Sequence, residues 1–473
     1  MKYLYGASVQ GIQSYIFKTN ELRDIAGASE LVEQACTTLF LKTLGKQNDK
    51  TWIQENQIIA AAGNVKYTLN EAECREAVLN FPKAVMCMAP GITISQAVVK
   101  IEGNFKAAIN ELEKKLHEAR NQQASPMTFG LLGMRRAPRT GLPAVTYDND
   151  GRAIDEATSA KRKHFNLKTL CKKSFGTSTE HRDIAYDIKD MTCDNDWIAI
   201  IHADGNGLGR VVQEVGGDPE KYSRFSQHLD EATWRSAQEA FNTIDASPGN
   251  NKCIPIRPVV LGGDDMTTII RGSLAIDYIK TYLTEFEKNT KSLLKDYLPA
   301  GMNCLSACAG VAFIKSSYPF YYGYNLAEEL CGQAKKLSDR AFSCIMFHKV
   351  QDSFVTSYDD IVRRELSIDG KPMLKYGPYS LEPKGEWLTI NALQHICQKL
   401  EDPANQGIKT GIRRWLTALH EGRGNAGQML SRMKAIHDNK ELINTLTNQR
   451  HMDNAVAAAD ILSIYTIINQ KTR

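Results

Sequence analysis

Pro258-Val-Val-Leu-Gly-Gly-Asp-Asp-Met-Thr-Thr-Ile-Ile270 has the composition of a β-hairpin, with two short apolar runs on either side of a glycine-rich turn. Gly262 and Gly263 allow backbone conformations that a side chain would forbid, and they let a ligand approach the main chain closely. Asp264 and Asp265 are adjacent like charges, which favours the recruitment of a hard cation such as Mg²⁺. The alternative is a solvated acidic turn.

A second acidic position lies upstream of this hairpin. Trp197-Ile-Ala-Ile-Ile-His-Ala-Asp-Gly-Asn-Gly-Leu-Gly209 reads as an apolar strand that ends in Asp204, followed by a glycine-rich turn. Its glycines do not follow the GxGxxG order of a dinucleotide-binding turn. An aspartate at a strand end, beside an Asp-Asp hairpin on a neighbouring strand, is the arrangement of a palm-type nucleotidyltransferase. There, two Mg²⁺ ions hold a nucleoside triphosphate and activate an attacking hydroxyl.

Four motifs resemble, in their order and spacing, the second palm domain of the large subunit of type III CRISPR effectors. That domain is a relative of GGDEF and adenylyl cyclase domains. Two N-terminal stretches resemble the opening of the same subunit's first palm, so that the resemblance covers about three quarters of the chain. The second-palm motifs are Asp204-Gly-Asn-Gly-Leu-Gly209, Gly262-Gly-Asp-Asp265, Leu305-Ser-Ala-Cys-Ala-Gly-Val311 and Ala327-Glu-Glu-Leu-Cys-Gly-Gln-Ala-Lys335; the first-palm stretches are Gly11–Phe17 and Leu22–Leu31.

The fold that follows is α+β, with two ferredoxin-like, nucleotidyl cyclase-like palm domains and a helical C-terminal domain. The order of strand and helix patterns supports it, because a strand, helices, a hairpin, a helix and a strand recur in the two halves. The expected units are a first, degenerate palm (1–125), a basic irregular linker region (126–194), a second, catalytic palm with the GGDD motif (195–350), a linker (351–385) and a helical C-terminal domain (386–473).

The first palm is expected to lack the metal site. Laid on the catalytic hairpin, Ala62-Gly-Asn-Val65 takes the place of Gly262-Gly-Asp-Asp265, keeping the turn and replacing both carboxylates. The expected role of this copy is structural, or it forms one wall of the nucleotide pocket.

The resemblance implies which residues form the site. Asp204, Asp264 and Asp265 are the expected catalytic residues and ligands of Mg²⁺ or Mn²⁺. Asn206 stands where relatives often have a second acidic residue, so one ligand could be a backbone carbonyl instead. Lys335 lies where a lysine of the cyclases contacts the triphosphate, with a solvated helix face as the alternative. The expected nucleotide-binding residues are Gly205, Asn206, Gly262, Gly263 and Lys335.

The function implied is that of a nucleotidyl or oligonucleotide cyclase, which makes cyclic adenylate-type second messengers from ATP in CRISPR-type or related antiviral defence. An alternative is a non-catalytic, RNA-binding scaffold subunit of an RNA-guided complex, and another is a free-standing sensor enzyme. ATP is the expected substrate, guide RNA and other effector subunits are the partners implied, and a homo-oligomer stays open. The N-terminal HD nuclease domain that often precedes the first palm is expected to be absent, because the sequence starts at the palm.

Composition narrows the class of protein. The 473 residues, 42% hydrophobic and 24% charged, are typical of several globular domains, and a net charge of +4 means that nucleotide binding must be local. The eleven cysteines form no CxxC pair, which indicates buried thiols rather than disulfides or zinc. With no signal peptide and no transmembrane run, a cytoplasmic protein without membrane contact is expected.

The most basic region lies between the palms. Gly133–Gly141, Lys161–His164, Lys172 and Lys173 concentrate its positive charge. Contact with phosphate or RNA is one interpretation. A solvated linker helix is the one that the composition favours.

Overall fold

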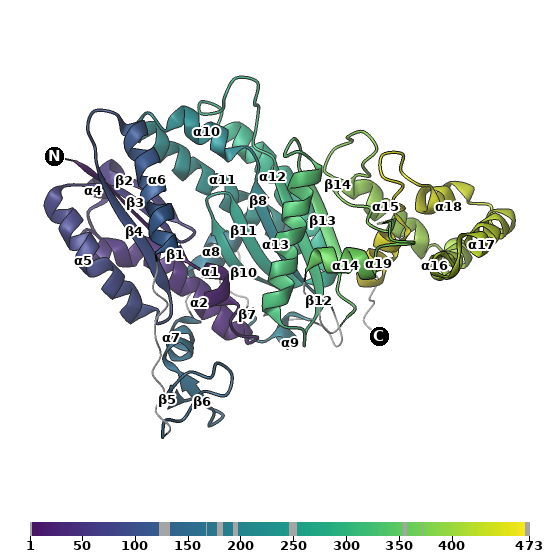
Figure 1. The fold of residues 1–473 in the computed structure, drawn as a ribbon, viewed down its shortest axis with the longest axis horizontal. Helices are drawn as coiled ribbons and strands as arrows, with labels where there is room; N and C mark the ends of the chain where they lie inside the picture. Colours follow the sequence, from purple (N-terminus) through teal and green to yellow (C-terminus); the bar gives the residue numbers. More distant parts are fainter. Residues whose placement is uncertain are drawn as a thin grey trace.

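The computed structural model describes residues 2–122, 133–166, 168–176, 183–192, 197–245, 253–352, 357–371 and 373–468. Mixed helices and sheets fill these residues, with helices gathered at the C-terminal end, so the predicted α+β class is confirmed (Figure 1).

The first sheet is antiparallel and has the strand order β2-β3-β1-β4. This is the order of a ferredoxin-like palm, in which a central hairpin joins the two halves. Helices precede the hairpin and separate it from the last strand. The elements are β1 (Tyr3–Gln10), α1 (Ile12–Ile16), α2 (Leu22–Gln34), a π-helical segment (Ala35–Leu39), α3 (Phe40–Thr43), α4 (Lys50–Asn56), β2 (Gln57–Ala61), β3 (Asn64–Leu69), α5 (Glu71–Met88), β4 (Thr93–Lys100) and α6 (Phe105–Asn121).

The second sheet has six strands in the order β10-β11-β8-β12-β13-β14. Its first four strands repeat the order of the first sheet, and β13 is added in parallel to β12. The elements are β8 (Trp197–Gly205), α10 (Leu208–Val215), α11 (Pro219–Asp245), β9 (Cys253–Ile254), β10 (Ile256–Gly262), β11 (Asp265–Arg271), a 3₁₀ turn (Gly272–Leu274), α12 (Ala275–Leu293), β12 (Ala307–Lys315), α13 (Phe320–Leu337) and β13 (Cys344–Lys349).

The two sheets are copies of one unit, as the internal repeat predicts. Both hairpins carry a bulge at the same distance from the turn, with Ile58 skipped in β2 and Val259 skipped in β10. A shared irregularity of this kind is hard to explain by strand order alone. The sequence alignment of the two hairpin turns is, however, shifted by one residue relative to their strand pairing.

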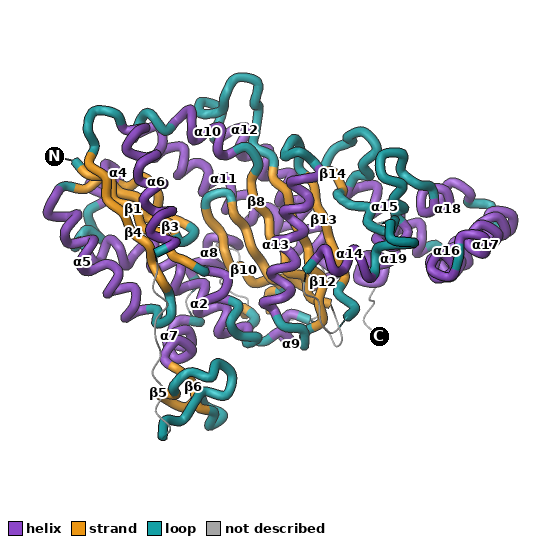
Figure 2. The backbone as a smooth tube through the Cα atoms, viewed as in Figure 1, coloured by secondary structure: helices purple, strands orange, loops and turns teal. Residues whose placement is uncertain are grey.

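Helix α13 lies close against one face of the second sheet (Figure 2), and Gly310 is the reason. A Cβ atom at Gly310 would lie 1.9 Å from the carbonyl oxygen of Ala327 and 2.5 Å from the amide nitrogen of Cys331. Residues 307–314 of β12 are all buried, so the other face is covered as well. The small residues of β12 therefore fix the distance between helix and sheet, and with it the position of Lys335.

The region between the palms differs from the irregular linker that the sequence suggested. It holds a small hairpin and several helices, and its basic residues are not uniformly solvated. The buried Lys161 donates a hydrogen bond to the carbonyl of Tyr15 at 2.6 Å, and Arg162 pairs with Asp24 at 2.8 Å. These cations anchor the helix of residues 156–164 to α1 and α2 of the first palm, which composition alone could not reveal. The elements are β5 (Ala144–Tyr147), β6 (Ala153–Asp155), α7 (Glu156–His164), α8 (Thr169–Phe175), β7 (Asp183–Ile184) and α9 (Ile188–Met191).

The C-terminal part is helical, as the sequence predicts, with α15 to α19 between residues 390 and 468. The stretch expected to be a linker contributes a helix and a short strand, β14, that pairs with β13 and extends the second sheet. The elements are α14 (Tyr358–Arg364), β14 (Tyr379–Ser380), α15 (Ile390–Glu401), a 3₁₀ turn (Pro403–Asn405), α16 (Gln406–Glu421), α17 (Arg423–Ile436), α18 (Lys440–Thr447) and α19 (Ala458–Ile468). Within the described residues, no helix is both long and apolar enough to cross a membrane.

Candidate metal and nucleotide site

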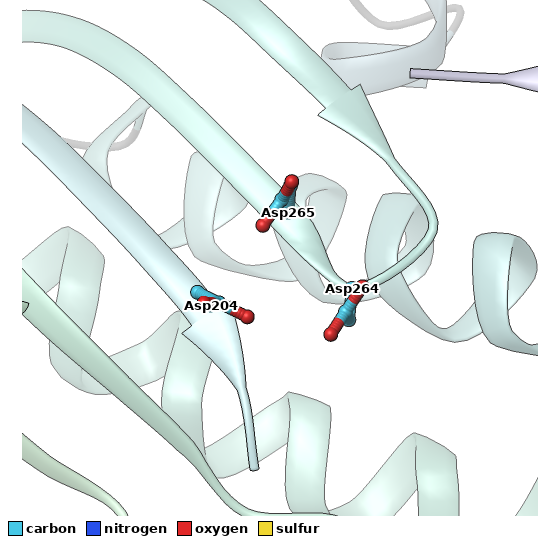
Figure 3. A group of neighbouring side chains, drawn as sticks. All are labelled: Asp204, Asp264 and Asp265. Carbon is cyan, nitrogen blue, oxygen red and sulfur yellow. The ribbon is translucent and has the colours of Figure 1, made fainter. Parts of the chain in front are cut away.

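Three carboxylates converge where two neighbouring strands meet the hairpin turn (Figure 3). Asp204 ends β8, Asp264 lies in the turn, and Asp265 begins β11. One oxygen from each carboxylate lies within 4.8 Å of the other two. The sequence predicted this convergence, and the antiparallel register of β8 and β11 produces it by placing Met266 opposite Ala203.

The cluster is electrostatically unfavourable without a cation. Burial, and then the charge of Asp204, raise the pKa of Asp264 to about 7. Burial, and then the charges of Asp264 and Asp204, raise the pKa of Asp265 to about 8. Three hard oxygen donors so close together fit a divalent cation such as Mg²⁺ or Mn²⁺, which would neutralise them.

Lys335 supplies one positive charge to this cluster. Its ammonium group pairs with Asp204 and donates a hydrogen bond to the carbonyl oxygen of Gly205 at 2.9 Å. The side chain is mostly buried. The alternative of a solvated helix face is therefore wrong. Contact between Lys335 and a triphosphate stays a prediction.

Glycines make room for the carboxylates and the turn. A Cβ atom at Gly205 would lie 2.9 Å from the Cβ of Asp264, so a larger residue would push the acids apart. Gly263 has a φ angle of 61°, which favours glycine. A Cβ atom at Gly262 would lie 3.2 Å from the amide nitrogen of Ala62, in the turn of the first palm. The two hairpin turns therefore touch each other.

Side chains from helix α11 and from α8 bind the acidic turn of residues 262–265. Thr233 Oγ1 donates a hydrogen bond to the carbonyl oxygen of Gly263 at 2.5 Å, and Asp230 Oδ1 accepts one from the Gly263 amide at 3.3 Å. Lys173 joins them, because its ammonium group lies 2.9 Å from Asp230 Oδ1 and 3.0 Å from the carbonyl oxygen of Leu261. Thr233 and Asp230 were not predicted from the sequence, since neither belongs to a motif and both act from a distant segment. Lys173 was named only as part of the basic region, without this contact to the turn.

Asn206 does not join the acidic cluster. Its buried side chain donates hydrogen bonds to Ser306 Oγ at 3.1 Å and to Cys308 Sγ at 3.3 Å. The amide therefore ties the loop after β8 to the start of β12. The amide nitrogen is thus engaged away from the carboxylates, and contact between Asn206 and a nucleotide stays a prediction.

The hairpin of the first palm has positions equivalent to those of Asp264 and Asp265, but they hold residues without carboxylates. This hairpin closes on the pair Ala61 and Asn64, whereas the hairpin of the second palm closes on Gly262 and Asp265. Asn64 therefore corresponds to Asp265, and the preceding turn residue, Gly63, corresponds to Asp264. The sequence alignment, which set Asn64 against Asp264, was wrong by one residue because it matched the turn residues by amino-acid type rather than by strand pairing. The conclusion that both carboxylates are replaced is unchanged.

Comparison with known proteins supports the second palm directly. Residues 197–342 match the family model for Cas10/Cmr2, second palm domain. The resemblance to the large subunit of type III CRISPR effectors is confirmed. The matched residues contain all three carboxylates and Lys335. No curated protein sequence matches the chain.

Solved structures extend the likeness to the whole fold. A chain from a Csm1–Csm4 cassette in complex with cA4 is 14% identical and superposes with a TM-score of 0.58, covering 99% of this chain and 69% of that one. A second, from a Csm1–Csm4 cassette in complex with pppApA, is 13% identical with a TM-score of 0.59, covering 100% and 69%. A third, from the Csm1–Csm4 subcomplex of a type III-A CRISPR-Csm interference complex, is 14% identical with a TM-score of 0.56, covering 99% and 69%. At these identities the likeness shows the fold alone.

Proposed function

We propose that this protein is a Mg²⁺-dependent nucleotidyltransferase that joins ATP molecules into cyclic adenylates and releases pyrophosphate. The observation that carries the proposal is the convergence of Asp204, Asp264 and Asp265 at one end of the second palm. When bound, divalent cations would neutralise the triphosphate and lower the pKa of the attacking hydroxyl. Mn²⁺ would serve in place of Mg²⁺.

The protein itself contributes a turn that phosphate groups can approach and a positively charged side chain. The glycine-rich turn of Gly262 and Gly263 lets phosphate groups approach the main chain, and Lys335 places a cation beside Asp204. A ribose hydroxyl of one nucleotide forms a bond to the α-phosphorus of another. The bond between that α-phosphorus and the oxygen that bridges it to the β-phosphate breaks, and pyrophosphate leaves. The proton of the attacking hydroxyl passes to solvent.

Joining two nucleotides requires a second surface beside the metal site. The first palm supplies one, because its turn at Ala62 touches Gly262 within the same chain. Because the two hairpin turns are in contact, the second nucleotide would lie beside that contact, on the surface of the first palm. Catalysis then does not need a homodimer.

The choice of ATP and of cyclic products rests on the relatives. Csm1–Csm4 cassettes have been solved with cA4, with AMPPNP and with pppApA, all of them adenylates or an ATP analogue. The same structures make a Csm4-like subunit the first partner to seek, with guide RNA arriving through the assembled complex. A cytoplasmic location would follow from this role.

The proposal is tested by incubating the purified chain with each nucleoside triphosphate in Mg²⁺ or Mn²⁺ and identifying products by mass. Cyclic adenylates from ATP, absent with the other three triphosphates, are the expected result. The assay is repeated with a Csm4-like partner and target RNA, because a subunit that acts only when assembled would be silent alone. No product in any arm would favour the scaffold alternative.

A further inference from the structure

Two buried thiols lie side by side in the sheet of the second palm. Cys308 of β12 and Cys344 of β13 are register partners in a parallel pair, so their side chains lie on the same face of the sheet. Their Sγ atoms are 3.5 Å apart, and both side chains are fully buried. Neighbouring strands lie about 4.8 Å apart, and a disulfide spans Cα atoms that are about 4.4–6.8 Å apart. The backbone therefore allows these two sulfurs to bond without rearrangement of the sheet.

The polar surroundings of Cys308 favour its reactive form. Asn206 Nδ2 donates a hydrogen bond to Cys308 Sγ at 3.3 Å, and Ser338 Oγ lies 3.6 Å from the same sulfur. Hydrogen bonds donated to a sulfur stabilise the thiolate, which is the form that attacks an oxidant. Cys308 is therefore suited to react first, and Cys344 lies in place to react with the product.

A cavity open to solvent reaches the residues around this cysteine pair. It has a volume of about 820 Å³, and its wall includes Asn206, Phe342 and Ser343. Asn206 bonds to Cys308 Sγ, the carbonyl oxygen of Phe342 lies 3.8 Å from the same sulfur, and Ser343 precedes Cys344 in the chain. An oxidant as small as hydrogen peroxide in this cavity is thus one residue away from the thiols.

We propose that Cys308 and Cys344 are a peroxide-sensitive modification site that forms a reversible disulfide. The Cys308 thiolate attacks one oxygen of hydrogen peroxide and the O–O bond breaks. The other oxygen leaves as water after protonation, and Cys308 becomes a sulfenic acid. The Cys344 sulfur then attacks the Cys308 sulfur, the S–O bond breaks, and a second water carries away the thiol proton of Cys344. Two thiols have lost two electrons, and one peroxide has been reduced to two waters.

The disulfide would act on the loop beside Asp204. Cys308 is also the register partner of Asp204 in β8, and Asn206 follows in the next loop. A neutral disulfide sulfur accepts a hydrogen bond more weakly than a thiolate does, so the tie between Asn206 and β12 is weakened when the disulfide forms. Lys335 binds the carbonyl oxygen of Gly205 in the same segment. The oxidised chain is therefore expected to turn over nucleotide more slowly, a consequence that rests on the proposed function.

The test treats the folded full chain with hydrogen peroxide, blocks the remaining thiols under denaturing conditions and maps tryptic peptides by mass. The expected product joins residues 296–315 to residues 341–349 with the loss of two hydrogens, and dithiothreitol reverses it. Cys304 and Cys308 share the first peptide, because no Lys or Arg separates them. Cys304→Ser is therefore the matched control and should keep the cross-link, whereas Cys344→Ala should abolish it.

Hydrogen exchange measures the effect on the loop without any need for turnover. Residues 205–207 should exchange faster in the oxidised chain than in the reduced one. Pyrophosphate release from ATP in Mg²⁺ should fall at least about tenfold on oxidation, in proportion to the cross-linked fraction, and recover with dithiothreitol.

The inference is overturned if peroxide forms no cross-link between these peptides, if Cys304→Ser loses the cross-link, or if hydrogen exchange at residues 205–207 is the same in both states. These outcomes do not depend on activity. A chain that forms the disulfide and loosens the loop, but releases no pyrophosphate in either state, contradicts the proposed function alone.

Discussion

The acidic turn of residues 262–265 is held by side chains whose own sequence context gives no sign of that role. Thr233 and Asp230 bind the two backbone groups of Gly263 from one helix, and Lys173 binds the carbonyl of Leu261 from another. The turn itself is rich in glycine and would otherwise be free to move. These contacts limit how far Asp264 and Asp265 can shift from the metal position.

Removing one of these contacts should reduce turnover more than stability. Thr233→Val keeps the side-chain volume and deletes the hydrogen bond to Gly263, at a cost of about 1 kcal/mol in folding free energy. Misplaced carboxylates should lower kcat roughly tenfold, with KM little changed. Thr243→Val is the matched control, because Thr243 bonds to Ala240 within the same helix and away from the turn. Equal kinetics in both variants would contradict a positioning role.

A buried acid in the C-terminal part should make stability depend on pH. Asp460 Oδ2 accepts hydrogen bonds from Tyr379 Oη at 3.0 Å and from the Gly377 amide at 3.3 Å. Burial raises its pKa to about 6. The folded state therefore holds the proton more tightly than the unfolded chain, so this stabilising contribution is complete below the ordinary pKa and is lost as the pH rises through about 6.

Asp460→Asn keeps a neutral side chain at every pH. The melting temperature of the variant relative to the parent should be higher at pH 7.5 than at pH 5, by the equivalent of about 1 kcal/mol. Asp359→Asn alters an exposed acid nearby and should show no such trend. A constant difference across this pH range would show that Asp460 is already ionised in the folded protein.

At the scale of elements, one helix–strand contact determines how closely α13 packs on the sheet of the second palm. Gly310 lets α13 approach β12 closely, and the same helix carries Lys335 to Asp204. The small residues of this buried strand leave room for such a close neighbour. The partner helix and its exact register were not predictable from the pattern.

Gly310→Ala should destabilise the protein strongly. The added methyl would meet the backbone of Ala327 and Cys331, which cannot move without shifting α13, so a cost of at least about 3 kcal/mol is expected. Gly332→Ala is the control in the same helix, where nothing lies within 4 Å of the new Cβ and helix propensity should add up to about 1 kcal/mol. Chemical denaturation of both variants measures the difference. Similar stabilities would disprove the tight contact.

The elements also show what sequence could and could not predict. Local chemistry fixed the hairpin, the acidic strand end and most helices, because glycine turns and apolar periodicity act over a few residues. Alignment of the two turns failed by one residue, since strand pairing depends on partners far along the chain. The basic region was misjudged for a related reason: Lys161 donates a hydrogen bond to the carbonyl of Tyr15 and Arg162 pairs with Asp24, and both partners belong to the first palm.

At the scale of the whole molecule, α11 connects the two palms. Ser223 Oγ donates a hydrogen bond to the carbonyl of Gln57 in the first hairpin at 2.5 Å, and Thr233 of the same helix binds the second hairpin. Both hairpins are thus bound to one helix, and they approach each other at Gly262 and Ala62. The duplicated fold is therefore asymmetric, with the cluster of three carboxylates on the second palm.

This asymmetry predicts where metal ions bind. Crystals soaked in Mn²⁺ should show anomalous signal beside Asp204, Asp264 and Asp265 and none beside Ser8 and Asn64, because the first palm offers no carboxylate there. The Asp264→Asn, Asp265→Asn variant provides the control and should lose the signal. Mn²⁺ bound at Asn64 would mean that the first palm is not metal-free.

The most direct test of the central claim is pyrophosphate release from ATP in Mg²⁺, comparing the parent with Asp264→Asn, Asp265→Asn, under the assembly conditions that give product. Both substituted residues lie at a turn, and replacing adjacent, half-buried like charges by neutral isosteres should leave the fold intact or more stable, as thermal melting would show. We expect the variant to lose at least about 1,000-fold in rate, because the positive charge of the bound divalent cations would supply most of the stabilisation of the transition state. A folded variant with an unchanged rate would contradict it.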